Sequence, residues 1–415
     1  MTPVNVGYAM QEGVEIRRPP FNGPANHVRE VVESLSRRGH RVRVLVRIGG
    51  GIWRSDDLTT FTPVHVRRWD RGPLRLLERG VRRLQSDLGL PYAAAFESLR
   101  FAQACVEELH GCDLLYERFG WMGYGCGLAA RRLRVPLVLE DNGDHLLDLE
   151  AKHMAPTGVQ RRVALALMRR AVRRASHVVS TGAGWREQFI RRWGIEGRRV
   201  TAIENGTLLT RLLDRDQLRS FGPAAEPGAP VTLVYVGGFY PWHGVPILLR
   251  AVAGARAAGA QVRLMLIGSG ERAQEARDLT AELGLADSVT FAGHLQPAEY
   301  APLLAAADAG VSPYCGWPEF SGLKVLDYKA AGLPTIASGT GGHPPTVRDG
   351  HTGMVVPPCG VEALRDAIVR LCANPSLRRR MGQAARLEAE RLHAWEHTAE
   401  RLEAIFAAVA AEGRQ

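Results

Sequence analysis

Short apolar runs alternate along the chain with longer segments in which apolar residues recur every three or four positions. The first such run is Val4–Tyr8, a helical pattern follows at Val28–Arg38, and a second run follows at His40–Val46. This alternation is typical of parallel βαβ units. It starts again at Thr232–Val236, and from Glu362 onward the pattern is helical. The pattern therefore predicts an α/β chain with two doubly wound, Rossmann-like domains.

A glycine- and proline-rich segment separates the two repeats of this pattern. Phe221–Pro230 reads FGPAAEPGAP, a composition that favours turns. The chain has 415 residues, which is long for one hydrophobic core and enough for two. We therefore expect the interdomain linker in this segment.

The charge is unevenly distributed between the two halves. Of 53 Lys and Arg and 43 Asp and Glu residues, 33 and 21 lie in residues 1–200, so the basic excess lies in the first half. Such a field favours an anionic partner, either a membrane surface or a phosphate-bearing acceptor. No nucleic-acid-binding motif accompanies the charge, so we do not expect nucleic acid as a partner.

The predicted helix at Arg161–Arg174 carries six of these arginines. It could lie on a membrane surface. The favoured interpretation is an ordinary packing helix with a solvated basic face, on which Val163 and Leu167 face the core.

The sequence gives no sign of export or of a membrane span. Its opening, MTPVNVGYAM, lacks the basic and apolar regions of a signal peptide, and no run of 18 apolar residues occurs. The cysteines have neither metal-ligand spacing nor the spacing of a disulfide framework, which suits a reducing cytoplasm. We expect a cytoplasmic protein, with peripheral contact to the inner face of the membrane as an alternative.

The most informative stretch is DAGVSPYCGWPEFSGLKVLDYKAAGLPTIAS, from Asp308 to Ser338. It predicts a buried strand, a loop, a helix that begins near Ser321, and another strand. The first-turn amides and Lys324 would attract an anion, and carboxylates stand at both ends of this segment. This combination suits a sugar nucleotide; the alternative is an ordinary βαβ crossover with a capped helix. The segment supplies the carboxylates Glu319 and Asp327 and the amides of Ser321, Gly322 and Leu323. Lys329, later in the same predicted helix, is expected to face solvent.

The spacing Glu319-x7-Asp327, followed by AAGLP and TIAS, resembles the Glu-x7-Glu signature of retaining family 4 glycosyltransferases. The second carboxylate is Asp here. The resemblance covers about the whole chain and implies the two-domain GT-B fold. It implies an N-terminal acceptor-binding domain at 1–208, a nucleotide-sugar-binding domain at 209–390, and a C-terminal helix at 391–415 that crosses back to the first domain.

Three other segments carry weaker parts of the resemblance. The loop GGFYPWHG, residues 237–244, resembles the diphosphate loop of the family, but Gly238 and His243 stand where Arg and Lys are common. We expect Lys324 to compensate for these charges and His243 to donate a hydrogen bond to phosphate. Asn22–His27 resembles the glycine motif that faces the donor, and Gly293-His294-Leu295 resembles the border of the nucleobase site.

The resemblance implies transfer of a sugar from a nucleotide-sugar donor, with UDP favoured, to a hydroxyl acceptor. A phosphate-linked lipid is one candidate for this acceptor. Glu319 would hold the sugar hydroxyls and Asp327 the ribose, without metal or cofactor, and the departing phosphate would take the acceptor proton. The implied catalytic residues are Glu319, Lys324, Asn142 and Asp141. The implied donor-binding residues are Gly23, Gly237, Gly238, His243, His294, Phe320, Ser321, Gly322, Leu323 and Asp327.

Two other functions remain compatible with the sequence. A non-hydrolysing nucleotide-sugar epimerase has the same fold and would change the donor without an acceptor. A non-catalytic nucleotide-sugar-binding module would bind the donor without turnover.

Overall fold

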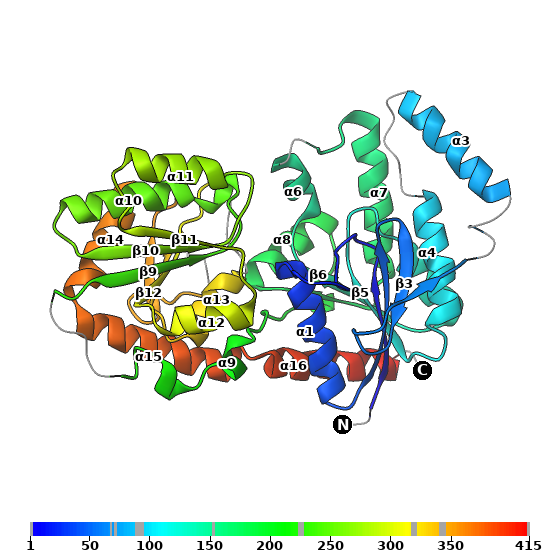
Figure 1. Ribbon diagram of the computed structural model, residues 1–415. Coiled ribbons are helices and arrows are strands. Elements are labelled where there is room, and N and C mark those ends of the chain that lie inside the picture. Colours follow the sequence, from blue (N-terminus) through cyan, green and yellow to red (C-terminus); the bar gives the residue numbers. More distant parts are fainter. Residues whose placement is uncertain are drawn as a thin grey trace. The chain divides into compact units, whose positions relative to one another are not determined.

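A computed structural model of the chain is shown in Figure 1. The structure describes residues 3–66, 69, 73–87, 95–151, 154–222, 228–316, 322–339 and 346–412. The chain forms two compact units. Unit 1 comprises Met1–Glu204 and Thr398–Gln415, and unit 2 comprises Asn205–His397.

Unit 1 contains an eight-stranded sheet with the order β4-β3-β2-β1-β5-β6-β7-β8. β3 and β4 pair antiparallel to their neighbours, and all other pairs are parallel. Its strands are β1 (Asn5–Met10), β2 (Arg41–Ile48), β3 (Gly51–Ser55), β4 (Thr62–Val64), β5 (Leu114–Arg118), β6 (Leu137–Asp141), β7 (His177–Ser180) and β8 (Val200–Ala202).

The helices of unit 1 follow the strands as βαβ units require. They are α1 (Gly23–Arg37), α3 (Pro73–Asp87), α4 (Ala95–Glu108), α5 (Gly125–Leu133), α6 (His145–Ala151), α7 (Gly158–Arg174), α8 (Ala183–Trp193) and the 3₁₀ helix η1 (Gly197–Arg199). Side chains of α4, α5, α7 and α8 form one apolar core with alternate residues of the central strands. These helices therefore cover the same face of the sheet.

The last helix, α16 (Trp395–Glu412), packs on unit 1 from Thr398 onward. The ring of Phe406 lies 5.2 Å from that of Tyr116 in β5. The buried carboxylate of Glu403 accepts hydrogen bonds from Arg38 and contacts His40 at 2.9 Å. Apolar packing and a charge-assisted hydrogen bond thus join the end of the chain to its beginning.

Unit 2 contains a six-stranded parallel sheet with the order β11-β10-β9-β12-β13-β14. Its strands are β9 (Val231–Val236), β10 (Val262–Ile267), β11 (Val289–Gly293), β12 (Ala309–Ser312), β13 (Thr335–Ser338) and β14 (Gly353–Val356). Its helices are α9 (Leu209–Leu212), η2 (Arg215–Gln217), η3 (Pro241–His243), α10 (Val245–Ala257), α11 (Ala273–Glu282), α12 (Pro297–Ala305), α13 (Leu323–Ala330), α14 (Val361–Ala373) and α15 (Pro375–Leu392).

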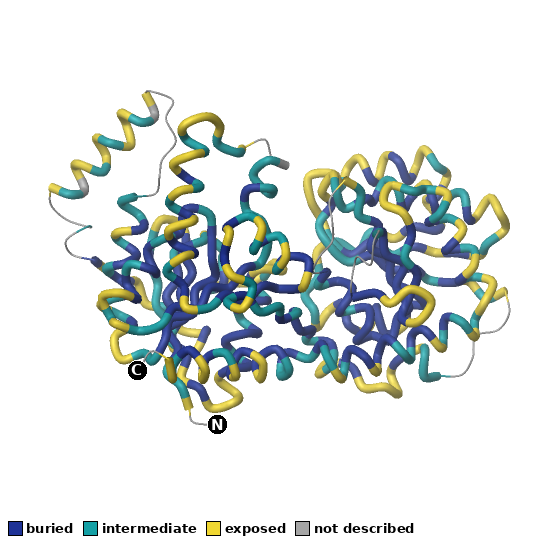
Figure 2. The backbone as a smooth tube through the Cα atoms, turned by 180° about the vertical axis from the view of Figure 1, so that it is seen from behind, coloured by how far each residue is buried: buried dark blue, intermediate teal, exposed yellow. Residues whose placement is uncertain are grey.

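The central strands β5 and β6 of unit 1 and β12 and β13 of unit 2 are buried on both faces, and Figure 2 shows a dark blue interior in each unit. Fully buried parallel strands explain the continuous apolar runs in the sequence. Among the described residues, no helix combines the length and the apolar character that a bilayer crossing needs.

The predicted linker at 221–230 is wrong, because unit 2 already begins at Asn205. Leu209, Leu213 and Leu218 are buried in one apolar cluster with Val234 of β9 and Tyr328 of α13. The chain therefore joins the second core before the glycine- and proline-rich segment, whose residues 223–227 lie outside the described part.

The predicted inner face of α7 is wrong for Val163, whereas Leu167 is partly buried and packs against the core as expected. Val163 is 47% exposed, and the buried residues of this helix are Ala164, Met168, Ala171 and Val172. Two alanines and a methionine provide the close contact with the sheet. The valine that sequence hydrophobicity placed inside therefore faces solvent.

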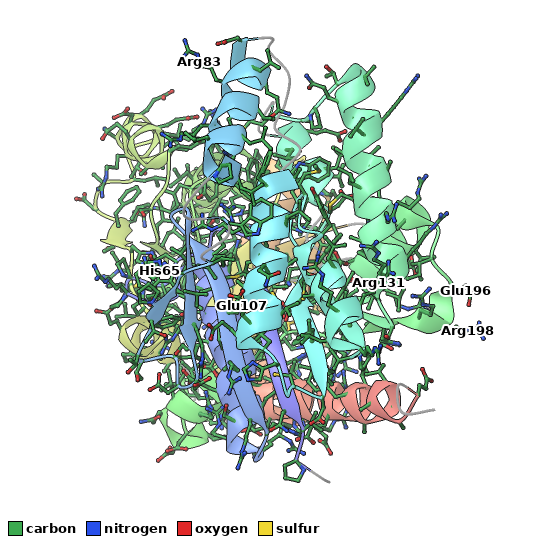
Figure 3. The ribbon with its side chains drawn as sticks, turned by 90° about the vertical axis from the view of Figure 1, so that its right-hand side faces the viewer. His65, Arg83, Glu107, Arg131, Glu196 and Arg198 are labelled. Carbon is green, nitrogen blue, oxygen red and sulfur yellow. A yellow bond between two sulfur atoms is a disulfide. The ribbon has the colours of Figure 1, made fainter. Side chains whose placement is uncertain are left out.

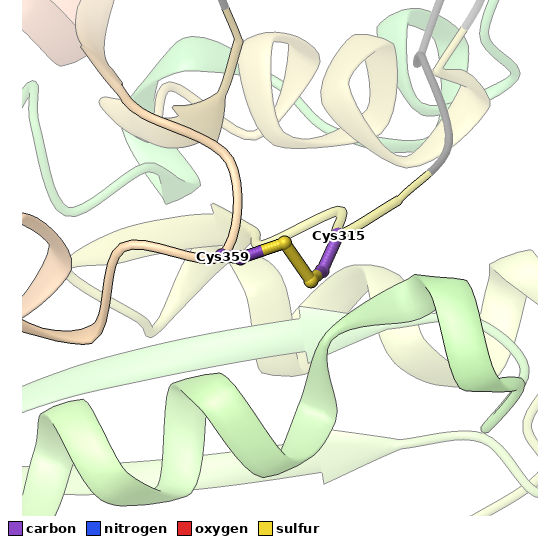
Figure 4. The surroundings of a disulfide bond; sticks show 2 residues. All are labelled: Cys315 and Cys359. Atoms are coloured by element: carbon purple, nitrogen blue, oxygen red, sulfur yellow. A yellow bond between two sulfur atoms is a disulfide. The ribbon is translucent and has the colours of Figure 1, made fainter.

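The expectation of no disulfide is contradicted. Cys315, which follows β12, is bonded to Cys359, which follows β14 (Figure 4). The two cysteines are 44 positions apart in the sequence. The parallel strands bring their carboxyl ends to the same edge of the sheet, so the pairing follows from the fold and not from the spacing.

We predict that Gly310→Ala in β12 lowers the free energy of unfolding by about 1–3 kcal/mol because of overpacking. A Cβ at this position would lie 2.3 Å from ring carbons of Tyr328. That ring cannot move freely, because its hydroxyl accepts from the Val236 N–H and donates to the Val311 carbonyl.

Urea unfolding measures this effect. The control is Gly80→Ala in α3, where a Cβ meets nothing within 4 Å and alanine favours the helix. An unchanged unfolding midpoint for Gly310→Ala would show that the ring has more room than the structure indicates.

Candidate functional site

The strand order of unit 2 changes direction between β9 and β12. From β9 the chain proceeds to β10 and β11 on one side, and from β12 to β13 and β14 on the other. Ligands of open α/β sheets bind at the carboxyl ends of strands at such a point. Two loops meet there: Gly237–Gly244 after β9, and the segment from Pro313 after β12. This edge is the candidate site of unit 2.

Glycine is required where these loops touch. Gly244 has φ +68°, and a Cβ on it would lie 1.6 Å from the carbonyl oxygen of Pro313. A Cβ on Gly237 would lie 3.2 Å from Cε of Lys324. The glycines of GGFYPWHG therefore allow the backbone to approach the second loop and leave room for the lysine.

His243 is held inside the loop. Its Nδ1 lies 2.5 Å from the carbonyl oxygen of Gly238, and its Nε2 lies 3.1 Å from the hydroxyl of Tyr314. Burial and the charge of Lys324 lower the pKa of His243 to about 3, so the ring is neutral at physiological pH. A neutral ring that donates to Gly238 accepts from Tyr314. The N–H that the sequence assigned to phosphate is directed to Gly238 in this structure.

Lys324 lies in the first turn of α13 and is only 9% exposed. Its Nζ lies 4.9 Å from the ring centroid of Tyr235 and 4.5 Å from that of Tyr314. Gly322 precedes the helix in extended conformation without a side-chain cap, and the predicted Leu323 begins it. The amides of a first helical turn have no intrahelical partner, so this turn offers N–H donors and an ammonium together.

The carboxyl group of Asp327 is oriented by two hydroxyl groups. Thr207 donates to Oδ1 at 2.6 Å, and Tyr300 donates to Oδ2 at 2.7 Å. Burial raises the pKa of Asp327 to about 6 despite these hydrogen bonds. Each carboxylate oxygen can accept a second hydrogen bond, so ribose hydroxyls are compatible with this arrangement.

The remaining predicted residues of unit 2 fall into two groups. Glu319, Phe320 and Ser321 lie outside the described residues. His294 follows β11, is exposed, and has its Nε2 2.9 Å from Nε2 of Gln296.

In unit 1 the strand order changes direction between β1 and β5. Glu140, near the end of the adjacent β6, is the centre of a buried polar cluster there. Its Oε1 lies 2.8 Å from Nε2 of His27, 3.1 Å from Nη1 of Arg118 and 2.5 Å from Nδ2 of Asn142. Burial raises the pKa of Glu140, but His27 and Arg118 outweigh this effect and lower it to about 2. Glu140 is therefore ionised and fixes the side chain of Asn142.

Asp141, the last residue of β6, is 3% exposed and has the opposite character. It accepts hydrogen bonds from Ser180 of β7 and from the amide of Gly143. Burial raises the pKa of Asp141 to about 7, since these bonds do not offset the loss of solvent. The neighbouring carboxyls 140 and 141 thus differ in protonation near neutral pH.

The predicted glycine of unit 1, Gly23, is the first residue of α1. The Asn22 side chain caps this helix by accepting from the Ala25 N–H at 3.0 Å, and a proline follows Gly23. Asn, Gly and Pro are ordinary signals for a helix start, so they explain this segment without a ligand.

Lys329, which the sequence placed in solvent, is fully buried. Its ammonium contacts Glu388, donates to the Thr346 carbonyl at 3.0 Å and lies 3.1 Å from Nε2 of His393. The interpretation as a surface residue is therefore wrong. This lysine joins α13 to α15.

Sequence reasoning missed the tyrosines of unit 2 and the partners of Glu140. Tyr235 lies within an apolar run and Tyr314 follows one, so both appear as ordinary core residues. His27 and Arg118 are distant from Glu140 in sequence. Arg118 ends β5 and His27 lies near the start of α1, and only these positions could have suggested that the two residues meet Glu140. Among the described residues, no three His, Cys, Asp or Glu side chains are grouped to hold a metal ion.

We predict that Asp141→Asn stabilises the protein increasingly as the pH rises. A carboxyl with a raised pKa in the folded state gives its full stabilisation below its ordinary pKa and loses it as the pH rises through about 7. Asn does not ionise, so Asp141→Asn does not lose stability in this way as the pH rises. Its unfolding free energy should exceed that of the wild type by on the order of 1–3 kcal/mol at pH 8 and by little at pH 4.

Glu140→Gln is the matched control, because the stabilisation by Glu140 depends on pH in the opposite direction. The pKa of Glu140 is lowered to about 2, so its stabilisation is present above about pH 4.5 and is lost as the pH falls toward 2. Denaturant unfolding from pH 3 to pH 8 measures both variants. Parallel pH profiles of the wild type and Asp141→Asn would contradict the assignment.

Two family models match the chain. Glycosyl transferase 4-like domain matches residues 22–206, and Glycosyl transferases group 1 matches residues 216–388. Together they cover every strand of the two sheets except β1.

Two curated relatives indicate the same class of enzyme. The D-inositol 3-phosphate glycosyltransferase of Nocardia farcinica is 29% identical over 70% of this chain and 65% of its own length. The phosphatidyl-myo-inositol mannosyltransferase of Mycobacterium leprae is 31% identical over 55% of this chain and 62% of its own length. The matches thus span less than two thirds of these relatives.

Solved structures show the same fold. Anabaena HepE in complex with UDP has a TM-score of 0.70 at 17% identity, covering 97% of this chain and all of that one. Sucrose-phosphate synthase of Thermosynechococcus elongatus has a TM-score of 0.67 at 23% identity, covering 98% and 100%. With the two family matches, these results show that the chain belongs to the glycosyltransferase family of the family 4, group 1 type and has the GT-B fold.

Proposed function

We propose that this glycosyltransferase is a retaining enzyme that takes its sugar from a nucleotide-sugar donor, with UDP as the favoured nucleotide. The observation that carries the proposal is the first turn of α13 at the switch point of unit 2, where Gly322 precedes the helix and Lys324 lies in its first turn. Helix N-termini with a lysine suit a diphosphate. The UDP complexes of the structural neighbours support the choice of nucleotide.

The proposed chemistry requires no protein nucleophile and no metal. The bond between the anomeric carbon and the diphosphate oxygen breaks as the α13 amides and Lys324 stabilise the leaving charge. The acceptor oxygen forms its bond on the same face of the sugar, and its proton passes to the departing phosphate. Asp327 holds the ribose, Glu319 holds the sugar, and Asp141 and Asn142 lie on the acceptor side.

The proposed acceptor is a hydroxyl compound linked to phosphate, such as a phosphate-linked lipid. The basic excess of residues 1–200 favours an anionic acceptor, and the two relatives are named for D-inositol 3-phosphate and phosphatidyl-myo-inositol. Assembly of a cell-surface glycan, a glycolipid or a glycosylated natural product is consistent with such an acceptor.

The same basic excess supports a cytoplasmic protein that touches an anionic membrane. The outer face of α7 combines the exposed apolar residues Val159 and Val163 with exposed arginines. Within the described part of the chain, the arginines of this face make no ion pair. Burial is the main cause of the lowered pKa of Arg174, and the positive charges of Arg170 and Arg131 (labelled in Figure 3) lower it further. The arginines of the face are Arg162, Arg169, Arg170 and Arg173.

Nucleotide binding tests the donor site. UDP, GDP, ADP and dTDP are compared by thermal shift on the wild type, Lys324→Ala and the charge-preserving control Lys324→Arg. A nucleotide at one hundred times its dissociation constant adds about 2.7 kcal/mol of stability. We expect UDP to stabilise the wild type most, Lys324→Arg partly and Lys324→Ala least.

If none of the four nucleotides stabilises the wild type, the donor-site proposal fails. Product analysis separates the other functions: transfer to an acceptor supports the proposal, conversion of the UDP-sugar to an epimer without acceptor indicates an epimerase, and binding without turnover indicates a binding module.

Vesicle sedimentation tests membrane contact. Each basic residue near an anionic bilayer contributes about 1 kcal/mol, so replacing Arg169, Arg170 and Arg173 by Gln should weaken binding to anionic vesicles at least about tenfold. Replacing three exposed arginines of unit 2 removes the same charge and is the matched control: Arg250, Arg263 and Arg380. Equal effects of the two triple variants, or equal binding to zwitterionic vesicles, would contradict contact through α7.

A further inference from the structure

The ammonium of Lys324 lies close to two tyrosine rings that come from different segments. Tyr235 is in β9 and fully buried, and Tyr314 follows β12 and is half-buried. The distances from Nζ to the two ring centroids, 4.9 and 4.5 Å, are within the range of cation–π attraction. Both rings therefore attract the charge that the proposed donor site uses.

Hydrogen bonds hold both rings in place. The Tyr235 hydroxyl donates to the Gly238 carbonyl at 2.7 Å, and the Tyr314 hydroxyl lies 3.1 Å from Nε2 of His243. His243 in turn donates to the same Gly238 carbonyl. The GGFYPWHG loop thus supplies no fixed charge of its own, but it orients both rings against the lysine.

The backbone beside Tyr314 is fixed as well. The Cys315 N–H donates to the Trp242 carbonyl at 2.9 Å, and Cys315 is covalently bonded to Cys359. Tyr314 is therefore attached both to the GGFYPWHG loop and to the segment after β14. This attachment gives the ring a defined position even though it is only half-buried.

We infer that Tyr314 and Tyr235 are positioning residues that hold the Lys324 ammonium ready for the donor diphosphate. The inference rests on the proposed function of this site. A free lysine loses much rotamer freedom when it binds a ligand, and a lysine already held between ring faces loses less. A ring face attracts the ammonium charge without accepting a hydrogen bond from one particular N–H. The clamp formed by the two tyrosines thus adapts the site to a loop without Arg or Lys.

A double-mutant cycle tests the clamp, with UDP binding measured by calorimetry. The variants are Tyr314→Leu, which removes the ring, Tyr314→Phe, which keeps the ring and removes the hydroxyl, Lys324→Ala, and Tyr314→Leu with Lys324→Ala. Cation–π attraction corresponds to about a 3- to 30-fold effect on binding. We expect Tyr314→Leu to weaken UDP binding about 3- to 30-fold and Tyr314→Phe by less than about threefold.

The effect of Tyr314→Leu should fall below about twofold in the Lys324→Ala background, because the clamp acts only through the lysine. Three results would overturn the clamp. They are an equal loss of UDP affinity from Tyr314→Leu in both backgrounds, a loss of affinity in Tyr314→Phe as large as in Tyr314→Leu, and no loss of affinity in Tyr314→Leu. These outcomes leave the proposed function intact when the wild type binds UDP. If the wild type binds another of the four nucleotides instead of UDP, the same cycle is measured with that nucleotide, and failure to bind any of the four overturns the donor site itself.

Discussion

The close approach of two backbone segments at the switch point of unit 2 determines the rest of the candidate site. The turn at Gly244 passes so near the carbonyl of Pro313 that a Cβ would lie 1.6 Å from its oxygen. Because the loops after β9 and β12 touch, Tyr235, His243, Tyr314 and Lys324 come together although they belong to different βαβ units. A larger residue at this turn would force these segments apart, and the ammonium would lose its ring contacts.

The buried charges of the two units have different surroundings. In unit 1, Glu140 is ionised and surrounded by His27 and Arg118, so its charge is compensated inside the protein. In unit 2, the ammonium of Lys324 lies against aromatic faces beside a helix N-terminus. Aromatic faces attract a cation without neutralising its charge, which suits the donor role that we propose for unit 2.

Much of the fold was predictable because parallel strands produce local, continuous apolar runs. The strand expected at Thr232–Val236 occurs as β9, Val231–Val236, and the helix expected near Ser321 begins at Leu323. Failures arose where distant residues decide the outcome. Lys329 is buried because Glu388, 59 positions later, compensates its charge. Cys315 meets Cys359 because β12 and β14, on either side of β13, end at the same edge of the sheet.

The candidate site was predictable in position and only partly in detail. The sequence placed Lys324 and α13 at the correct edge because strand–loop–helix order determines that edge. It did not reveal that the N–H of His243 points to Gly238, since a loop closing on itself leaves no periodic pattern.

A crystal structure with UDP tests the central claim most directly, which is that the first turn of α13 and Lys324 bind the diphosphate. The account predicts phosphate oxygens roughly 3 Å from the amide nitrogens at the start of α13 and from Lys324 Nζ. A diphosphate bound only in unit 1, or in unit 2 away from α13 and Lys324, would contradict the account.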